Sequence, residues 1–271
     1  MQKLPLGGGD TLDNLNTQPS NTSIEKTPQP PTKTNDKSGF TLGIEANFGS
    51  DDFIMQSNRP SNFINHSITT NNFTFDGGIK LGYQHYFDKE ALGIKQAYGI
   101  STNLSFGVST PINGETYMTF IPQDPLDPQN FSYIFKASYL PIRVGLDVNF
   151  LWDFLQRGEH TLGLTVGLQY KFSYYKNTKA ELGNSDGAIS PEVNTSNAYD
   201  DIMLHSFVPQ IGLHYYYGNH QFNINCKFGI GYSSEITKGD MLKAFLGGDK
   251  LAYKMQIINS DYLSLEYSYR F

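Results

Sequence analysis

Apolar and polar residues alternate with a period of two along most of the chain after residue 38. The alternation is most regular where Leu164, Val166 and Leu168 are separated by Thr165 and Gly167. Successive side chains of a β-strand point to opposite faces, so each such segment predicts a strand with one apolar and one polar face. The pattern recurs in eight segments, at about residues 40–48, 73–84, 98–108, 140–150, 161–172, 207–217, 222–232 and 251–271.

The last of these segments is long enough to contain either one strand or a hairpin. Its odd positions Tyr253, Met255 and Ile257 have the same parity as the apolar odd positions from Leu263 to the end of the chain. We therefore expect one long strand with all of these side chains on one face, in preference to a hairpin near Ser260.

Charged residues of both signs fall on the polar faces. Arg143 and Asp147 alternate with Val144 and Leu146, which excludes a strand that is buried on both faces. We predict that the charges of the polar faces gather inside a closed sheet as a lumen charge cluster. The cluster consists of Glu45, Asp76, Lys80, Arg143, Asp147, Lys171, Lys227, Glu266 and Arg270.

The connections between the predicted strands alternate in length. They are long at residues 50–72, 109–130, 176–205 and 233–250, and short at residues 88–95, 153–159 and 218–219. Outer-membrane barrels have short periplasmic turns and longer outer loops. A soluble β-sandwich gives no reason for such alternation. With an even number of strands, both termini are expected on the periplasmic side.

Composition limits how such a chain crosses a membrane. The mean hydropathy is −0.41, and no uncharged apolar run reaches the roughly 18 residues of a transmembrane helix. The remaining way to span a bilayer is a closed β-barrel, because every backbone polar group in the hydrocarbon must be paired. Aromatic residues make up 14% of the chain and concentrate near strand ends, as in interfacial belts. The expected fold class is an all-β, antiparallel transmembrane β-barrel of about eight strands.

The chain divides into two parts by composition. Residues 1–37 are rich in Asn, Thr, Pro, Ser and Gly, which predicts a disordered periplasmic leader, and residues 38–271 form the barrel. Residues 1–10 have neither a basic n-region nor an apolar h-region, so we expect that a secretory signal peptide has been removed.

Charge and cysteine content exclude some partners. The net charge of −6 and the sequence pI near 5.5 argue against nucleic acid, which requires a basic face. The single cysteine, Cys226, lies in line with Phe222, Ile224 and Phe228, and we interpret it as a small apolar side chain.

Catalytic chemistry has little support in the pattern. A lipid-modifying enzyme needs a nucleophile with a nearby base. Of the histidines, His214 is expected to face the lumen and the others to lie in loops or at strand ends. Asp124 and Asp127 offer two carboxylates, whereas a calcium site needs about six ligands. We predict no catalytic residue, no cofactor and no bound metal.

The chain ends in an aromatic residue on an amphipathic strand. We predict that this ending is a signal for the barrel-assembly machinery, carried by Leu263, Leu265, Tyr267, Tyr269 and Phe271. The ending YSYRF (267–271) and the stretch YLPIRVGLDVNFLWDF (139–154) resemble the Helicobacter-type outer-membrane protein family. The resemblance implies an outer-membrane barrel scaffold. Larger members of that family carry outer domains that act as adhesins, and this chain has no room for such a domain.

These observations lead to one functional hypothesis and two alternatives. An eight-stranded barrel is just wide enough for side chains to fill it, so the mixed charges are expected to pair and close the lumen. The leading hypothesis is a non-enzymatic surface or scaffold protein with environment-facing loops, acting in adhesion or envelope integrity. The alternatives are a small diffusion pore and an outer-membrane lipid-modifying enzyme. The expected partners of this monomer are outer-membrane lipid, lipopolysaccharide, the barrel-assembly machinery and a host or environmental ligand.

Overall fold

The computed structural model describes residues 37–58, 63–64, 67–120, 131–184, 201–232, 236–238 and 252–271. All of them belong to one compact unit, Asn35–Phe271. The strands are β1 (Gly39–Asn58), β2 (Phe63–Ile64), β3 (Ser67–Tyr86), β4 (Tyr98–Ser109), β5 (Ile112–Phe120), β6 (Phe131–Arg157), β7 (His160–Asn184), β8 (Ile202–Tyr217), β9 (His220–Lys227), β10 (Ile230–Tyr232), β11 (Ile236–Lys238) and β12 (Ala252–Arg270).

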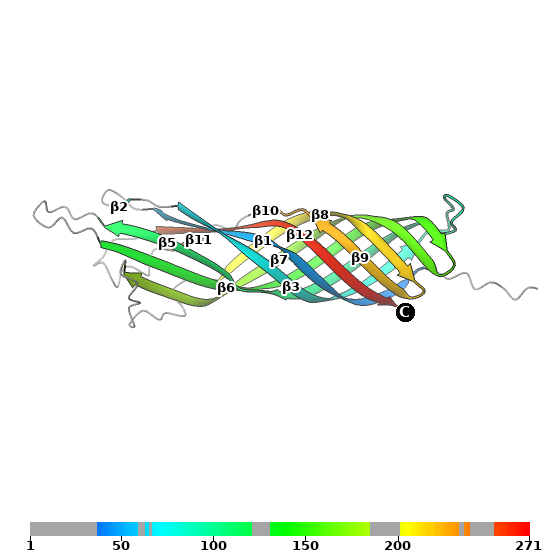
Figure 1. The fold of residues 1–271 in the computed structure, drawn as a ribbon, viewed down its shortest axis with the longest axis horizontal. Helices are drawn as coiled ribbons and strands as arrows, with labels where there is room; N and C mark the ends of the chain where they lie inside the picture. The colour runs from blue at the N-terminus through cyan, green and yellow to red at the C-terminus, as the bar shows by residue number, and fades with distance from the viewer. Residues whose placement is uncertain are drawn as a thin grey trace, which may run out of the picture. The chain divides into compact units, whose positions relative to one another are not determined.

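The strands of the described part close into an antiparallel barrel (Figure 1). The ring runs β1–β3–β4–β6–β7–β8–β9–β12 and returns to β1. The shorter strands extend members of this ring: β5 follows β4 along β6, and β10 follows β9 along β8. The prediction of an eight-stranded antiparallel barrel is therefore confirmed. No helix among the described residues is long and apolar enough to cross a membrane.

Tight hairpins lie at the same end of the barrel as the C-terminus (Figure 1). Gly158 and Glu159 join β6 to β7, and Gly218 and Asn219 join β8 to β9. Both glycines have a positive φ, at 63° and 58°. Glycine at the first central position of a two-residue turn allows this backbone without a steric penalty.

The middle of the barrel has an apolar outer face and a polar interior. Leu146 and Val148 expose 49% and 51% of their surface outward, whereas Asp147 between them is fully buried. The same alternation places Leu213 outside and His214 inside. A lipid-facing outer surface over a polar interior is the polarity of a transmembrane barrel. We refer to this part as the lipid-facing band.

At the end opposite the hairpins the polarity is reversed. A cluster of apolar side chains fills the interior there, consisting of Phe53, Met55, Ile112, Ala137, Tyr139, Tyr175, Ile202, Leu204, Met255 and Ile257. Many outward-facing residues at the same level are polar, among them Asn71, Asn113 and Lys136, while Met203 and Tyr117 are also exposed there. An apolar core under a polar surface is the arrangement of a barrel in water. We call this end the head: residues 52–58 of β1, 67–72 of β3, β5, 131–139 of β6, 175–184 of β7, 202–204 of β8, β11 and 252–259 of β12.

One sequence prediction is wrong in the head. The last strand is single, as expected, but its odd positions do not share a face. Met255 and Ile257 are 3% and 0% exposed, whereas Leu263 is 44% exposed. The cause is a register shift opposite β1, where Gly49 pairs with Tyr262 but Asp51 pairs with Asn259. The additional residue of such a β-bulge moves every following side chain to the other face.

The lengths of the outer connections are also corrected. Residues 50–72, 109–130 and 176–205 were expected as long loops, yet much of each is strand in β1, β3, β5, β7 and β8. The expectation failed because the alternation has the opposite direction there. The apolar residues of these segments face the interior, whereas those of the band face outward. Residues 233–250 lie almost entirely outside the described part of the chain.

Candidate functional site

The lumen of the band contains a connected network of buried charges. The Lys80 ammonium lies 2.8 Å from a Glu266 oxygen and 3.4 Å from an Asp147 oxygen. Lys227 lies 3.4 Å from Glu45 and 3.5 Å from Glu266. Strand register brings these groups together: Glu45 pairs directly with Glu266 across β1 and β12. The two lysines separate carboxylates that would otherwise repel each other.

Neutral amides complete the coordination of these carboxylates. Asn223 and Asn225 each donate to Glu266 over 3.1 Å. Asn103 and Asn149 donate to Asp147 over 2.6 and 2.5 Å. Buried charges are tolerated when they are paired and also hydrogen bonded, which is the case here.

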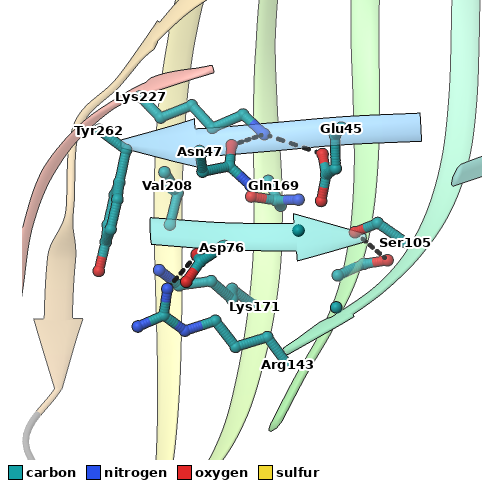
Figure 2. Close-up of a pocket in the computed structure, with 13 residues that line it drawn as sticks. Glu45, Asn47, Asp76, Ser105, Arg143, Gln169, Lys171, Val208, Lys227 and Tyr262 are labelled. Atoms are coloured by element: carbon teal, nitrogen blue, oxygen red, sulfur yellow. Dashed lines mark hydrogen bonds and ion pairs between the residues drawn. The ribbon is translucent and has the colours of Figure 1, made fainter. Parts of the chain in front are cut away.

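A second part of the network lies toward the head and surrounds Arg143 (Figure 2). Its guanidinium pairs with Asp76 and, over 2.5 Å, with Asp51. The Tyr262 hydroxyl also donates to Asp51. Lys171 makes no ion pair among the described residues, and its ammonium lies 4.2 Å from the centre of the Tyr262 ring. A cation–π contact of this kind partly compensates a buried ammonium.

The predicted lumen cluster is thus brought together, with one member set apart. Arg270 lies at the hairpin end, where it donates to the carbonyls of Lys37 over 3.2 Å and Gly218 over 3.3 Å. The two cavities between these groups measure about 30 and 20 Å³. A water molecule needs about 10–15 Å³ by this measure, so each has room for one or two waters and for no larger ligand.

Sequence reasoning missed a second buried cluster at the hairpin end. Asp153 is fully buried and lies 2.6 Å from the Lys37 ammonium and 2.6 Å from Nε2 of His214. The Tyr86 hydroxyl donates to the same carboxylate over 3.1 Å. Asp153 was expected in a turn and Lys37 in the leader. The available signal was parity, because Asp153 has the same odd parity as the inward residue Asp147.

The cluster also contains a hydroxyl, an imidazole and a carboxylate in sequence. Nδ1 of His214 lies 2.9 Å from the Thr165 hydroxyl, and its Nε2 contacts Asp153. Serine hydrolases use this order of groups to activate a nucleophile. Here Thr165 is 4% exposed and His214 is fully buried, and the neighbouring cavity measures about 20 Å³. The hydroxyl is therefore buried beside a cavity with room for one or two waters.

The residues of the predicted assembly signal line the outer face of β12. Leu263, Leu265 and Tyr269 are 44%, 42% and 36% exposed, and Phe271 is 72% exposed. The Phe271 amide donates to the Phe40 carbonyl over 2.9 Å, which fixes the end of the chain on β1. The aromatic ending is therefore accessible from outside the barrel. Its recognition by the assembly machinery stays a prediction.

A third cavity, of about 310 Å³, lies on the head and is much larger than those of the lumen. It lies along β5, β6 and β7, is bounded by Thr70 of β3, and is lined mainly by outward-facing residues of these strands. We call it the head groove, and its lining residues are Thr70, Asn113, Gly114, Glu115, Lys136, Ala137, Ser138, Lys179 and Glu181. The hydroxyl of Tyr117, two residues further along β5, donates to the lining residue Glu115 over 3.2 Å. This hydrogen bond to a carboxylate raises the pKa of Tyr117, so the phenol stays protonated as a donor.

No protein-family model and no curated relative matches the chain. Among solved structures, Neisserial surface protein A aligns with a TM-score of 0.32 and 12% identity, covering 86% of this chain and 98% of that one. The attachment invasion locus protein Ail of Yersinia pestis, in complex with the heparin analogue sucrose octasulfate, aligns at 0.27 and 10%, covering 86% and 99%. The outer membrane protease OmpT of Escherichia coli aligns at 0.32 and 9%, covering 86% and 97%. Similarity at this level does not transfer a function.

Proposed function

We propose that this chain is a non-enzymatic surface protein of the bacterial outer membrane, whose barrel anchors a rigid head outside the cell. The single observation that supports the proposal is the reversal of polarity along one continuous barrel. The band exposes Leu146 and Val148 to lipid, whereas the head buries Phe53 and Ile257 and turns polar residues outward. Such a head is stable only in water, so the barrel extends past the bilayer at this end.

The packed lumen favours this function over a diffusion pore. The cavities of about 30 and 20 Å³ are separated by the paired charges, and the apolar cluster of the head closes the lumen above them. The buried Thr165 and His214 likewise favour a non-enzymatic role. The resemblance to Helicobacter-type barrels is consistent with a surface scaffold and adds no ligand.

Orientation follows from the position of the hairpins. Short turns are periplasmic in outer-membrane barrels, and the C-terminus lies at the hairpin end (Figure 1). We therefore place both termini in the periplasm and the head in the medium, where it meets lipopolysaccharide and an environmental ligand. The chain acts as a monomer that the barrel-assembly machinery inserts.

Labelling of cysteines on intact cells tests this placement. Cys226 is first replaced by Ser, and a new cysteine is introduced as Lys136→Cys in the head or Glu159→Cys in a hairpin; both native side chains are exposed. A membrane-impermeant maleimide should label the head variant on intact cells and the hairpin variant only after permeabilisation. Labelling of the hairpin variant alone on intact cells would place the head in the periplasm and overturn the proposal.

A further inference from the structure

The head groove is separate from the lumen network and is open to the medium in the proposed orientation. Its volume of about 310 Å³ lies at the lower end of the range for small-molecule sites, roughly 300–1,000 Å³. The cavities in the lumen are about a tenth of that size or less. Among the described cavities the head groove is therefore the one that fits an organic ligand.

The charges of the groove balance each other. Lys136 on β6 stands opposite Glu115 on β5 and opposite Glu181 on β7. Its ammonium lies 3.9 Å from Glu115, while Lys179 lies 2.5 Å from Glu181. With two ammonium and two carboxylate groups in alternation, a strongly anionic or cationic ligand meets as much repulsion as attraction.

The groups of the groove are available to a ligand as both donors and acceptors. The ion pair between Lys136 and Glu115 is long, at 3.9 Å, and the two side chains are 55% and 43% exposed. The side-chain amide of Asn113 makes no hydrogen bond among the described residues, and Ser138 adds a hydroxyl. A ligand that presents hydroxyl groups satisfies both kinds of partner, because a hydroxyl donates and accepts at once.

The side chain of Asn72 makes hydrogen bonds to the backbone of β5, as a neighbouring strand would. β3 and β5 have no paired backbone at this level, and Asn72 bridges them. Its side-chain amide accepts from the Asn113 backbone N–H over 2.8 Å and donates to the Asn113 carbonyl over 2.9 Å. The polar groups of β5 are thereby fixed before a ligand binds, which lowers the entropic cost of binding.

An aromatic ring lies next to the lining residue Glu115. Tyr117 follows Glu115 on the outward face of β5, is 39% exposed, and is held by its hydrogen bond to Glu115. Its ring offers an apolar surface beside the polar groups, which suits a ligand with an apolar face and polar edges. We propose that the head groove binds a neutral glycan of one or two sugar units, with the ring faces against Tyr117 and the hydroxyls on Glu115, Lys136 and Asn113. This inference rests on the proposed function, because it requires a head outside the cell.

A glycan array tests the proposal with the full-length protein in detergent. The array carries neutral, sialylated and sulfated oligosaccharides. Titration calorimetry then measures the affinity for a neutral oligosaccharide that the array has identified. Glu115→Gln and Asn113→Ala should each weaken binding at least tenfold, and Ser138→Trp should abolish it by filling the groove. Lys176→Ala is the matched control, since Lys176 is exposed on the same strand as Lys179 but does not line the groove. All variants must retain a heat-modifiable gel mobility, which shows a closed barrel.

The outcomes separate this proposal from the placement of the head. Absence of binding to every neutral glycan, or binding that the groove variants leave unchanged, overturns the glycan site. Binding restricted to sialylated or sulfated glycans overturns it as well, because the groove would then recognise anions. None of these results bears on the maleimide labelling of the head, which decides the proposed function independently.

Discussion

At the residue scale, buried ionic groups decide how the lumen is filled. Arg143 stands between Asp51 and Asp76 and is 6% exposed, and neither carboxylate pairs with another cation among the described residues. Removing one partner of a buried pair costs more than the pair contributes, because the remaining charge is left without compensation. Removing one partner of the exposed pair Lys136 and Glu115 costs little, since water solvates the charge that remains.

We therefore predict different costs for two similar substitutions. Arg143→Ala should lower the free energy of unfolding by about 3–5 kcal/mol, because Asp51 and Asp76 then lose their ion-pair partner. Lys136→Ala should change it by about 1 kcal/mol or less. Urea unfolding in detergent, followed by tyrosine and tryptophan fluorescence, measures both. Equal effects would contradict the account of the lumen network.

A glycine in the head leads to a second prediction at this scale. A Cβ on Gly114 would overlap the Phe53 ring, which is itself fully buried. Gly114→Val should therefore destabilise the head by about 1–3 kcal/mol through overpacking. Gly77→Ala is the control, because a Cβ there meets no atom within 4 Å. Protease cleavage of the head under mild denaturation reports the difference, and the result expected is faster cleavage of the Gly114 variant only.

At the scale of the element, bulges decide which face of a strand meets lipid. β12 reverses its parity between Asn259 and Tyr262, so apolar odd residues serve the head core on one side and the lipid surface on the other. A similar change separates β4 from β5, where Val108 is 50% exposed and Ile112 is fully buried. The bulge allows one strand to serve two environments without a break in pairing.

Spin labels at two odd positions of β12 test this arrangement. A label at Leu263 should be accessible to oxygen dissolved in the bilayer, because this residue is 44% exposed on the band. A label at Ile257 should be shielded from both oxygen and a water-soluble relaxation agent, because Ile257 is fully buried. Similar oxygen accessibility at both positions would mean that the strand keeps one parity, as the sequence pattern suggested.

At the scale of the whole molecule, the barrel joins three layers of different chemistry. The hairpin end holds the cluster of Lys37, Asp153 and His214, the band holds the ionic network, and the head holds an apolar core. Each layer fills the lumen with side chains, as expected for a small barrel. A packed interior is consistent with the proposed role of the barrel as a membrane anchor for the head.

Conductance distinguishes this architecture from a pore. The purified protein in a planar bilayer should show no single-channel openings at 100 mV, because paired charges and the apolar core leave no continuous water path. A double variant, Lys80→Ala with Glu266→Ala, removes the ion pair between these residues and their pairs with Asp147 and Lys227. It should also stay silent, since the head core still blocks the path. Ion-selective openings of the unmodified protein would contradict the packed lumen.

Several features were determined by the sequence alone. Alternation in segments such as residues 161–172 is a local property of the strand, so it predicted the strands, their number and the inward position of Asp147 and His214. The lumen cluster followed from the same parity. The resemblance to a Helicobacter-type family and the assembly signal stay predictions.

Other features required the tertiary structure. Whether Ile257 faces lipid or core depends on a bulge opposite Ser50. The neighbouring strand sets the register at this point, so the alternation of residues within β12 alone cannot reveal the bulge. The contact between Lys37 and Asp153 joins residues 116 positions apart. The head groove likewise arises where β5, β6 and β7 align their outward polar residues. A period of two defines two faces of a strand, but only closure of the sheet against its neighbours decides which face meets water, lipid or the core.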